Sequence, residues 1–361
     1  MSRIVNMKGA GAAILARTVL WHLRYYVTGR SFPLASTFQL TNRCNLRCIM
    51  CNIPNNPRQG VLSLKDFKGI VAELGGLGCC YASLSGGEVL TIPDFFDYLH
   101  AAKSHIPSVN TVTNGLLLDK GAAVEFARSG VDSVSISLDG LEKTHEKTRA
   151  RKGAFSMTVE AIERLRTFAP GVRVVVNTVI APWNIDELRE LTLFVEGLGV
   201  FHKFQPLNEH PSFEGQTRPY GVAGLGTFDG AGVEELIKFL LTRKNVVNSR
   251  YFLRSIPAYL CGGVGGGLFD ADCTLPRYVV EFREDARMYP CLGGLGWKGG
   301  YPVAGGVGKV LGSAGYRADI KRLARCRSCT KSYSVCYIEP RVTFPVSNFI
   351  RYRLLPSFTT N

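Results

Sequence analysis

The chain has 361 residues, with 43 Lys or Arg against 29 Asp or Glu, so its formal net charge is +14. Such a charge attracts anions, including phosphorylated substrates and acidic membrane faces, but no known DNA- or RNA-binding motif accompanies it, so nucleic acid is disfavoured as a partner. An apolar content of 46% excludes a disordered chain, and eleven cysteines at tight local spacings are typical of intracellular metal ligation rather than of a secreted disulfide framework.

The N-terminal segment, residues 1–31, is predicted to form a basic amphipathic helix over residues 10–30. It does not resemble a cleavable signal, because Arg17 interrupts its apolar stretch. Helices of this type often lie on acidic membrane surfaces, and packing against the rest of the protein is the alternative. We therefore expect a cytoplasmic protein, with peripheral association at the inner face of an anionic membrane as a candidate interaction.

From residue 32 onward, apolar strands alternate with amphipathic helices. Six strands are predicted over residues 32–40, 80–84, 109–113, 131–138, 172–180 and 200–206. Five helices separate them, over residues 63–77, 95–103, 120–129, 155–168 and 186–198, with Ser63 as an N-cap. This alternation predicts right-handed crossovers and an α/β fold with a parallel sheet, in which ligands bind at the carboxyl ends of the strands.

Three cysteines follow the first predicted strand directly. Cys44, Cys48 and Cys51, in TNRCNLRCIMCN, form a C-x3-C-x2-C motif. Three thiolates at this spacing can hold three irons of a 4Fe–4S cube and leave the fourth iron open to a substrate. Structural zinc usually has four local ligands, and no fourth Cys or His lies nearby.

The run SLSGGEVL ends the second predicted strand at Gly86, Gly87 and Glu88. Glycines let the backbone approach a ligand closely, and a carboxylate suits an ammonium group. Together with the three cysteines, this motif resembles the radical SAM superfamily. The resemblance implies a partial (β/α)6 parallel barrel in which Gly-Gly-Glu receives the amino group of S-adenosylmethionine.

Further polar residues fall on the later strands or at their ends. The candidate contacts of S-adenosylmethionine are Asn114, Ser135, Ser137, Asp139, Asn177 and Gln205. The alternative for the serines and the aspartate is an ordinary strand that turns at Asp-Gly, and for Asn177 a buried structural amide. His145 and Arg149 lie one helical turn apart and are interpreted as a salt-bridged surface turn.

A second set of cysteines stands in the C-terminal third. Its members are Cys273, Cys291, Cys326, Cys329 and Cys336. The segment between the first two predicts a short hairpin, and C-x2-C at Cys326 is a metal-binding spacing. This set resembles the SPASM and twitch auxiliary-cluster domains, although Ala286 stands where their hairpin has a turn glycine.

The resemblance implies one auxiliary 4Fe–4S cluster on the first four of these cysteines, with Cys336 or Cys261 as a substitute ligand. Zinc is the alternative metal, because four thiolates in a closed site suit either. Cys79 and Cys80 are expected to be packed core thiols. The resulting division is a barrel over residues 32–210, a helical linker over 211–260, a small cysteine-rich α+β domain over 261–340 and a tail over 341–361.

The resemblance also implies a chemistry. Related enzymes take an electron from a donor such as flavodoxin or ferredoxin, cleave S-adenosylmethionine reductively and abstract hydrogen with the 5′-deoxyadenosyl radical. Only about thirty-five residues precede the first strand, too few for a fused leader-binding domain of ordinary size. We therefore expect a small-molecule, sugar or lipid-linked substrate, oxidised by two electrons through the auxiliary cluster. The alternatives are a ribosomal-peptide maturase and, in another class, a non-catalytic iron–sulfur binding or redox-sensing protein.

Overall fold

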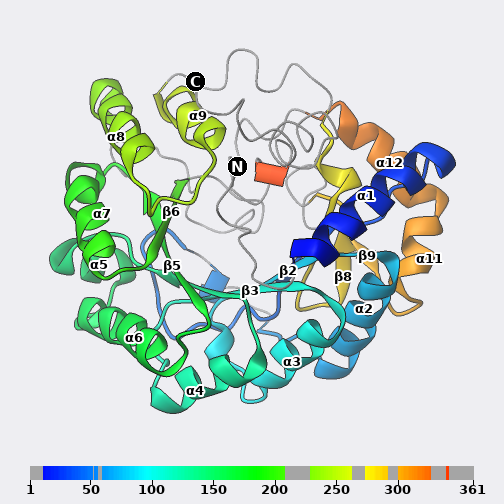
Figure 1. Cartoon of the computed structure of the whole chain (residues 1–361), viewed down its shortest axis with the longest axis horizontal. Coiled ribbons are helices and arrows are strands. Elements are labelled where there is room, and N and C mark those ends of the chain that lie inside the picture. The colour runs from blue at the N-terminus through cyan, green and yellow to red at the C-terminus, as the bar shows by residue number, and fades with distance from the viewer. Residues whose placement is uncertain are drawn as a thin grey trace.

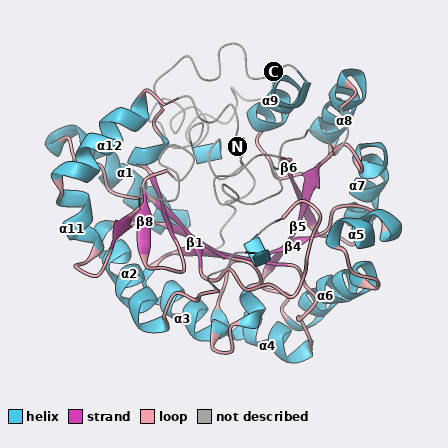
Figure 2. Ribbon diagram, turned by 180° about the vertical axis from the view of Figure 1, so that it is seen from behind, coloured by secondary structure: helices cyan, strands magenta, loops and turns pink. Residues whose placement is uncertain are grey.

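The computed structural model describes residues 11–51, 53–55, 59–207, 228–261, 273–291, 300–326 and 339–340. A curved parallel sheet lies at its centre (Figures 1 and 2). The six predicted strands are present as β1 (Ala35–Gln39), β2 (Tyr81–Ser85), β3 (Ser108–Thr113), β4 (Ser133–Ser137), β5 (Arg173–Ile180) and β6 (Phe201–Pro206). They lie in the order β6-β5-β4-β3-β2-β1, and every neighbouring pair is parallel. The predicted α/β sheet is confirmed.

Helices cover the outer, convex face of the sheet (Figure 1). The predicted ones are α2 (Leu64–Leu77), α3 (Phe95–His105), α4 (Lys120–Ser129), α6 (Ala154–Phe168) and α7 (Leu188–Gly197). Ser63 caps α2 as expected, because its Oγ accepts from the Asp66 amide at 3.1 Å. The sequence did not predict α5 (Glu142–Arg149), and α8 (Gly230–Thr242) and α9 (Arg250–Cys261) follow β6.

The two faces of the sheet differ in polarity, because successive side chains of a strand alternate between them. Phe38, Leu84 and Ile136 point to the helices and are fully buried in the main core. The concave face is polar: Asn110 donates to Ser83 at 3.1 Å and accepts from Ser133 at 2.8 Å. This face can therefore hold a polar ligand without exposing the core.

The C-terminal hairpin extends the same sheet. β7 (Val279–Phe282) pairs in parallel with β1, and β8 (Arg287–Tyr289) and β9 (Tyr301–Pro302) continue in antiparallel fashion to give nine strands among the described residues. α11 (Val307–Gly312) and α12 (Ala314–Ala324) follow. The predicted hairpin is confirmed, and Ala286 at its turn adopts the left-handed conformation, with φ of 55°. Alanine therefore occupies, at this turn, the left-handed conformation that favours glycine.

Ala150 is the other non-glycine residue with positive φ, at 52°, among the described residues, and it ends α5 on the surface. This conformation costs an L-residue roughly 1–2 kcal/mol, whereas glycine loses about 0.5–1 kcal/mol in chain entropy. We expect Ala150→Gly to raise the free energy of unfolding by about 0.5–1 kcal/mol in chemical denaturation. Ala72→Gly, at an exposed site within α2, should lower it by about 1 kcal/mol. If both substitutions changed the free energy of unfolding equally and with the same sign, this account of Ala150 would be contradicted.

The N-terminal helix α1 (Gly11–Thr28) packs against the sheet through one face only. Ile14 and Trp21 are buried, and the Trp21 indole donates to the Phe32 carbonyl. The other face exposes apolar side chains, among them Leu23 at 59% and Val27 at 84%. Packing against the sheet therefore explains the apolar residues on the buried face of this helix. Contact of its exposed apolar face with a membrane surface stays a prediction. Among the described helices, none has the length and apolarity that crossing a bilayer requires.

Candidate functional site

The loop with Cys44, Cys48 and Cys51 follows β1 at the carboxyl edge of the sheet, as predicted. Burial raises the pKa of Cys44 to about 11 and that of Cys51 to about 12, and the neighbouring Cys48 adds to both shifts. These thiols therefore stay protonated until a metal displaces their protons. Within the described part of the chain, no three Cys, His, Asp or Glu side chains converge as a single metal ion requires. The ligands of a cube need no such convergence, since each binds a different iron.

Gly86 and Gly87 are required by the approach of this loop to the end of β2. A Cβ on Gly86 would lie 2.5 Å from the Thr41 carbonyl oxygen, and one on Gly87 would lie 2.1 Å from that of Arg43. The amide of Gly87 donates to Thr41 at 2.7 Å, and that of Glu88 donates to Arg43 at 2.8 Å. The two motifs recognised in the sequence are thus bonded to each other.

The Glu88 carboxylate is fully buried and joins β2 to β3. It accepts from the Thr113 hydroxyl at 2.7 Å, the Asn114 amide at 2.7 Å and the Leu90 amide at 3.1 Å. Burial raises the pKa of Glu88, and these three donors oppose the rise. Direct binding of an ammonium group by Glu88 stays a prediction, because the structure shows this carboxylate held by internal donors.

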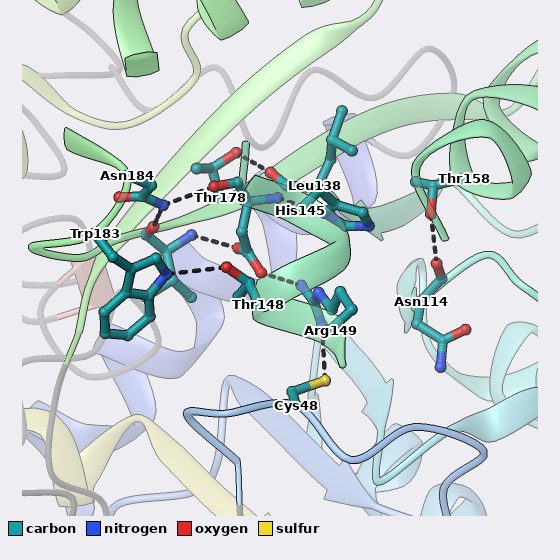
Figure 3. Close-up of polar contacts among 12 residues, drawn as sticks. Cys48, Asn114, Leu138, His145, Thr148, Arg149, Thr158, Thr178, Trp183 and Asn184 are labelled. Carbon is teal, nitrogen blue, oxygen red and sulfur yellow. Dashed lines mark hydrogen bonds and ion pairs between the residues drawn. The ribbon is translucent and has the colours of Figure 1, made fainter. Parts of the chain in front are cut away.

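Asn114 ties the end of β3 to the cysteine loop. Its side-chain amide donates to the Oδ1 of Asn45, which lies between the first two cysteines, at 2.7 Å. Its carbonyl accepts from the Thr158 hydroxyl at 3.3 Å (Figure 3). The structure therefore places Asn114 beside the loop, and Asn45 is a further residue of the site that sequence reasoning missed.

Arg149 reaches from α5 to the cysteine loop (Figure 3). Its Nη2 lies 2.6 Å from Asp139 Oδ2, and its Nη1 lies 3.7 Å from Cys48 Sγ. Burial lowers the pKa of Arg149, but the charges of Asp139 and Cys48 outweigh that effect and raise it overall. A permanent positive charge therefore stands beside the thiols.

The surface-turn interpretation of His145 and Arg149 was wrong, because both side chains are buried. His145 Nδ1 accepts from the Asp139 amide at 3.0 Å, so both residues of the pair hold Asp139. Burial, together with the nearby Arg149, lowers the pKa of His145 to about 2, and its ring is neutral. The polar sequence of α5 suggested solvent, whereas the helix packs against the end of β4.

Asp139 uses both carboxylate oxygens within the protein. Oδ1 accepts from the Val179 amide at 2.9 Å, and Oδ2 pairs with Arg149. The Asp139 carbonyl accepts from Asn184 at 2.7 Å. Its predicted contact with S-adenosylmethionine stays a prediction, and the structure shows Asp139 holding β5 and α5 together.

We expect Arg149→Met to lower the free energy of unfolding by about 3 kcal/mol, because it leaves the buried Asp139 carboxylate without its partner. Arg128→Met removes an exposed ion pair with Glu125 and should cost about 0–1 kcal/mol. Chemical denaturation of both variants under anaerobic conditions measures the difference. A loss as small as that of Arg128→Met would show that Asp139 does not depend on Arg149.

The remaining predicted contacts lie on the concave face of the sheet. Ser135 is buried and donates to Asn110 at 3.2 Å, whereas Ser137, Asn177 and Gln205 are half-buried. The Oδ1 of Asn177 is buried and has no hydrogen-bond partner among the described residues. An unsatisfied amide oxygen of this kind requires a polar ligand or water. Its position, next to Ser137 in the register of β4 and β5, fits a bound cofactor.

Three of the predicted auxiliary ligands are brought together elsewhere. Cys273 and Cys291 are buried, and Cys326 is half-buried against the same apolar cluster. Cys261 is exposed at the end of α9 and does not belong to that cluster. Cys329 and Cys336 lie outside the described residues.

The residues present fit both cofactors that the sequence implies. Three cysteines in one loop are the preferred donors of an iron–sulfur cube, and a buried guanidinium beside them offsets thiolate charge. Asn177 offers an unsatisfied polar atom on the same side of the sheet. Iron and S-adenosylmethionine would therefore find suitable donor atoms in the cysteine loop and at Asn177.

Comparison with known proteins identifies similar sequences for part of the chain. The family model of the radical SAM superfamily matches residues 38–195. The sporulation killing factor maturation protein SkfB of Bacillus subtilis is 31% identical over 170 residues, which are 47% of this chain and 41% of that protein. The mycofactocin maturase MftC of Mycobacterium tuberculosis is 30% identical over 178 residues, which are 49% of this chain and 45% of that protein. The matched part thus spans less than half the length of these relatives.

A solved structure shares the fold over a longer stretch. Streptococcus suis SuiB bound to S-adenosylmethionine superposes with a TM-score of 0.62 at 15% sequence identity. The match covers 86% of this chain and 71% of SuiB, so the likeness extends beyond the six parallel strands.

Proposed function

We propose, because residues 38–195 match the radical SAM superfamily, that this chain is an S-adenosylmethionine-dependent radical enzyme that matures a ribosomal peptide. The observation that carries the proposal is the bonded contact between the cysteine loop and Gly86-Gly87-Glu88 at the carboxyl edge of a parallel sheet. The relatives named as maturation proteins support a peptide over the small-molecule, sugar or lipid-linked substrate predicted from the sequence.

Cys44, Cys48 and Cys51 would hold a 4Fe–4S cluster, with an external donor such as flavodoxin or ferredoxin supplying its electron. Gly86 and Gly87 have no side chains, so the backbone at the end of β2 can lie directly against that loop. When bound, the cluster and S-adenosylmethionine would together supply a 5′-deoxyadenosyl radical that removes hydrogen from an unactivated carbon.

The chain itself supplies fixed charge and polar groups around the cysteine loop. Arg149 places a fixed positive charge beside Cys48, and Asp139 fixes the orientation of its guanidinium. Asn177, on the concave face, has a buried side-chain oxygen without a hydrogen-bond partner among the described residues, which a polar ligand could satisfy. The polar ladder from Ser83 through Asn110 to Ser133 gives the same face hydrogen-bonding groups for a peptide substrate.

The test of the substrate class uses short peptides encoded beside the gene for this chain. Each peptide is incubated anaerobically with reconstituted enzyme, reductant and S-adenosylmethionine, and its mass is compared with that of a sample lacking enzyme. We expect one peptide to change mass and to accelerate formation of 5′-deoxyadenosine. If every peptide keeps its mass while a sugar or lipid-linked compound is altered, the peptide assignment is wrong.

A further inference from the structure

The solvent-facing side of α1 is apolar along its length. The large exposed side chains of Gly11–Thr28 are all aliphatic or aromatic, and Leu20 and Tyr26 are 54% and 73% exposed. They recur three, four or seven residues apart and therefore share one side of the helix. This apolar stripe consists of Leu15, Val19, Leu20, Leu23, Tyr26 and Val27. A surface helix of a soluble protein normally turns polar residues to water, so the stripe requires another explanation.

The two arginines of α1 bind the barrel and leave the stripe uncharged. Arg17 donates to the carbonyls of Cys79 and His105, the second at 3.4 Å. Arg24 donates to the Leu77 carbonyl at 3.4 Å. Leu77 and His105 end α2 and α3, where helix carbonyls lack intrahelical partners and attract positive charge. These hydrogen bonds fix the polar side of α1 on the protein and leave its apolar side in water.

The helix α1 lies at the amino ends of the strands. Ile14 and Trp21 belong to one apolar cluster with Leu34, which directly precedes β1, and Tyr278, which directly precedes β7. The ring centroids of Trp21 and Tyr278 are 4.6 Å apart. The cysteine loop instead follows the carboxyl end of β1. A partner that covers the stripe is therefore held at the opposite edge of the sheet from the cysteine loop.

The positive charge of the chain is concentrated in its two terminal segments. Residues 1–65 contain nine Lys or Arg and no Asp or Glu, and residues 320–361 contain eight against one. The 254 residues between them carry 26 basic and 28 acidic side chains. Lys321 and Arg325 are exposed at the carboxyl end of α12, whose Leu323 belongs to the cluster that α1 covers (Figure 1). Arg30 is exposed just after α1, so basic groups accompany the stripe.

We propose that α1 docks this chain on an anionic lipid bilayer, with the apolar stripe at the acyl boundary and the basic groups near it at the headgroups. An interfacial helix gains from burial of apolar area and from attraction to acidic lipids. A second copy of the chain fits the stripe less well, because it would bring two basic segments together, and residues 1–65 offer no carboxylate to oppose them. The inference goes beyond the proposed function and does not depend on it.

Vesicle sedimentation with the full chain tests the proposal. One set of vesicles consists of phosphatidylcholine with phosphatidylglycerol as the acidic lipid, and the other of phosphatidylcholine alone. We expect binding to the anionic vesicles to be at least about 10-fold tighter, and to weaken as salt is raised, because salt screens the attraction. Absence of binding to the anionic vesicles, or equal binding to both sets, would overturn the proposal.

Leu20→Asp tests the stripe itself, and Leu193→Asp is the matched control. Leu193 is 50% exposed on α7, and both substitutions make the same change of charge. We expect Leu20→Asp to weaken binding to the anionic vesicles at least about 10-fold, and Leu193→Asp less than about 2-fold. Equal losses would show that net charge alone governs binding and that the stripe is not the contact.

Analytical ultracentrifugation of the same proteins tests the rival occupant. We expect the unaltered chain and Leu20→Asp to have the same oligomeric state in the absence of vesicles. If the unaltered chain dimerises, Leu20→Asp is monomeric and neither binds vesicles, the stripe is an interface between two copies and the proposal is wrong.

A fluorescence measurement locates the contact without weakening it. Tyr26→Trp places an indole in the stripe, and Tyr251→Trp places one at an exposed position of α9. Relative to the unaltered chain, we expect anionic vesicles to shift the emission of Tyr26→Trp to shorter wavelength, because its indole leaves water. The emission of Tyr251→Trp should not shift. Vesicle-bound Tyr26→Trp without a shift would place the membrane contact on another surface and overturn the proposal.

Discussion

Replacing Cys48 with alanine is expected to abolish reductive cleavage of S-adenosylmethionine. The loop supplies only three thiols, so losing one leaves two irons of the cube without protein ligands, and Arg149 loses its sulfur partner. We expect the rate of 5′-deoxyadenosine formation to fall at least about 1,000-fold, equivalent to about 4 kcal/mol. Bound iron should fall by about four per chain.

The control for Cys48→Ala is Cys79→Ala, which removes a buried thiol from the main core and should keep both iron and cleavage. High-performance liquid chromatography quantifies 5′-deoxyadenosine in each sample, and a colorimetric assay quantifies iron. Persistent cleavage by Cys48→Ala would show that the first cluster is held by other residues.

Gly87→Ala should have an effect nearly as large without removing any ligand. Its Cβ would lie 2.1 Å from the Arg43 carbonyl oxygen and 3.0 Å from Cys44 Cβ, and the backbone carbonyl cannot rotate away. The loop must then leave the end of β2, which breaks the Gly87–Thr41 and Glu88–Arg43 hydrogen bonds. We expect cleavage to fall about 100-fold or more, or roughly 3 kcal/mol.

Gly69→Ala is the matched control for this substitution. Gly69 lies in α2 and is exposed, and a methyl group added there would meet no described heavy atom within 4 Å. Alanine at this position should therefore stabilise the helix by up to about 1 kcal/mol. Cleavage should be unchanged in Gly69→Ala. Normal cleavage by Gly87→Ala would mean that the cysteine loop does not need its contact with β2.

Local patterns in the sequence were sufficient to predict most strands of the parallel sheet. The apolar strands and amphipathic helices are short-range signals, and the predicted helix at residues 120–129 has the bounds of α4. The helix α5 was missed because its sequence, EKTHEKTR, has no apolar face. His145 and Arg149 of this helix contact Asp139, in the loop between β4 and α5, and single-sequence periodicity does not report such contacts.

The pairing of β7 with β1 could not be predicted from the sequence either. About 240 residues separate the two strands, and no local pattern encodes a parallel partner. The cysteine motif and Gly-Gly-Glu were recognised, yet the reason for the two glycines was only partly foreseen. They admit the backbone of the cysteine loop itself. Asn45 carried no signal apart from its place between Cys44 and Cys48.

The most direct test of the central claim is reductive cleavage of S-adenosylmethionine by the unaltered chain. The protein is reconstituted anaerobically with iron and sulfide, then incubated with S-adenosylmethionine in the presence and absence of a strong reductant. The account predicts 5′-deoxyadenosine and methionine in equal amounts, and only in the reduced sample. Iron-loaded protein that yields no 5′-deoxyadenosine under reduction would contradict it and would favour a non-catalytic iron–sulfur protein.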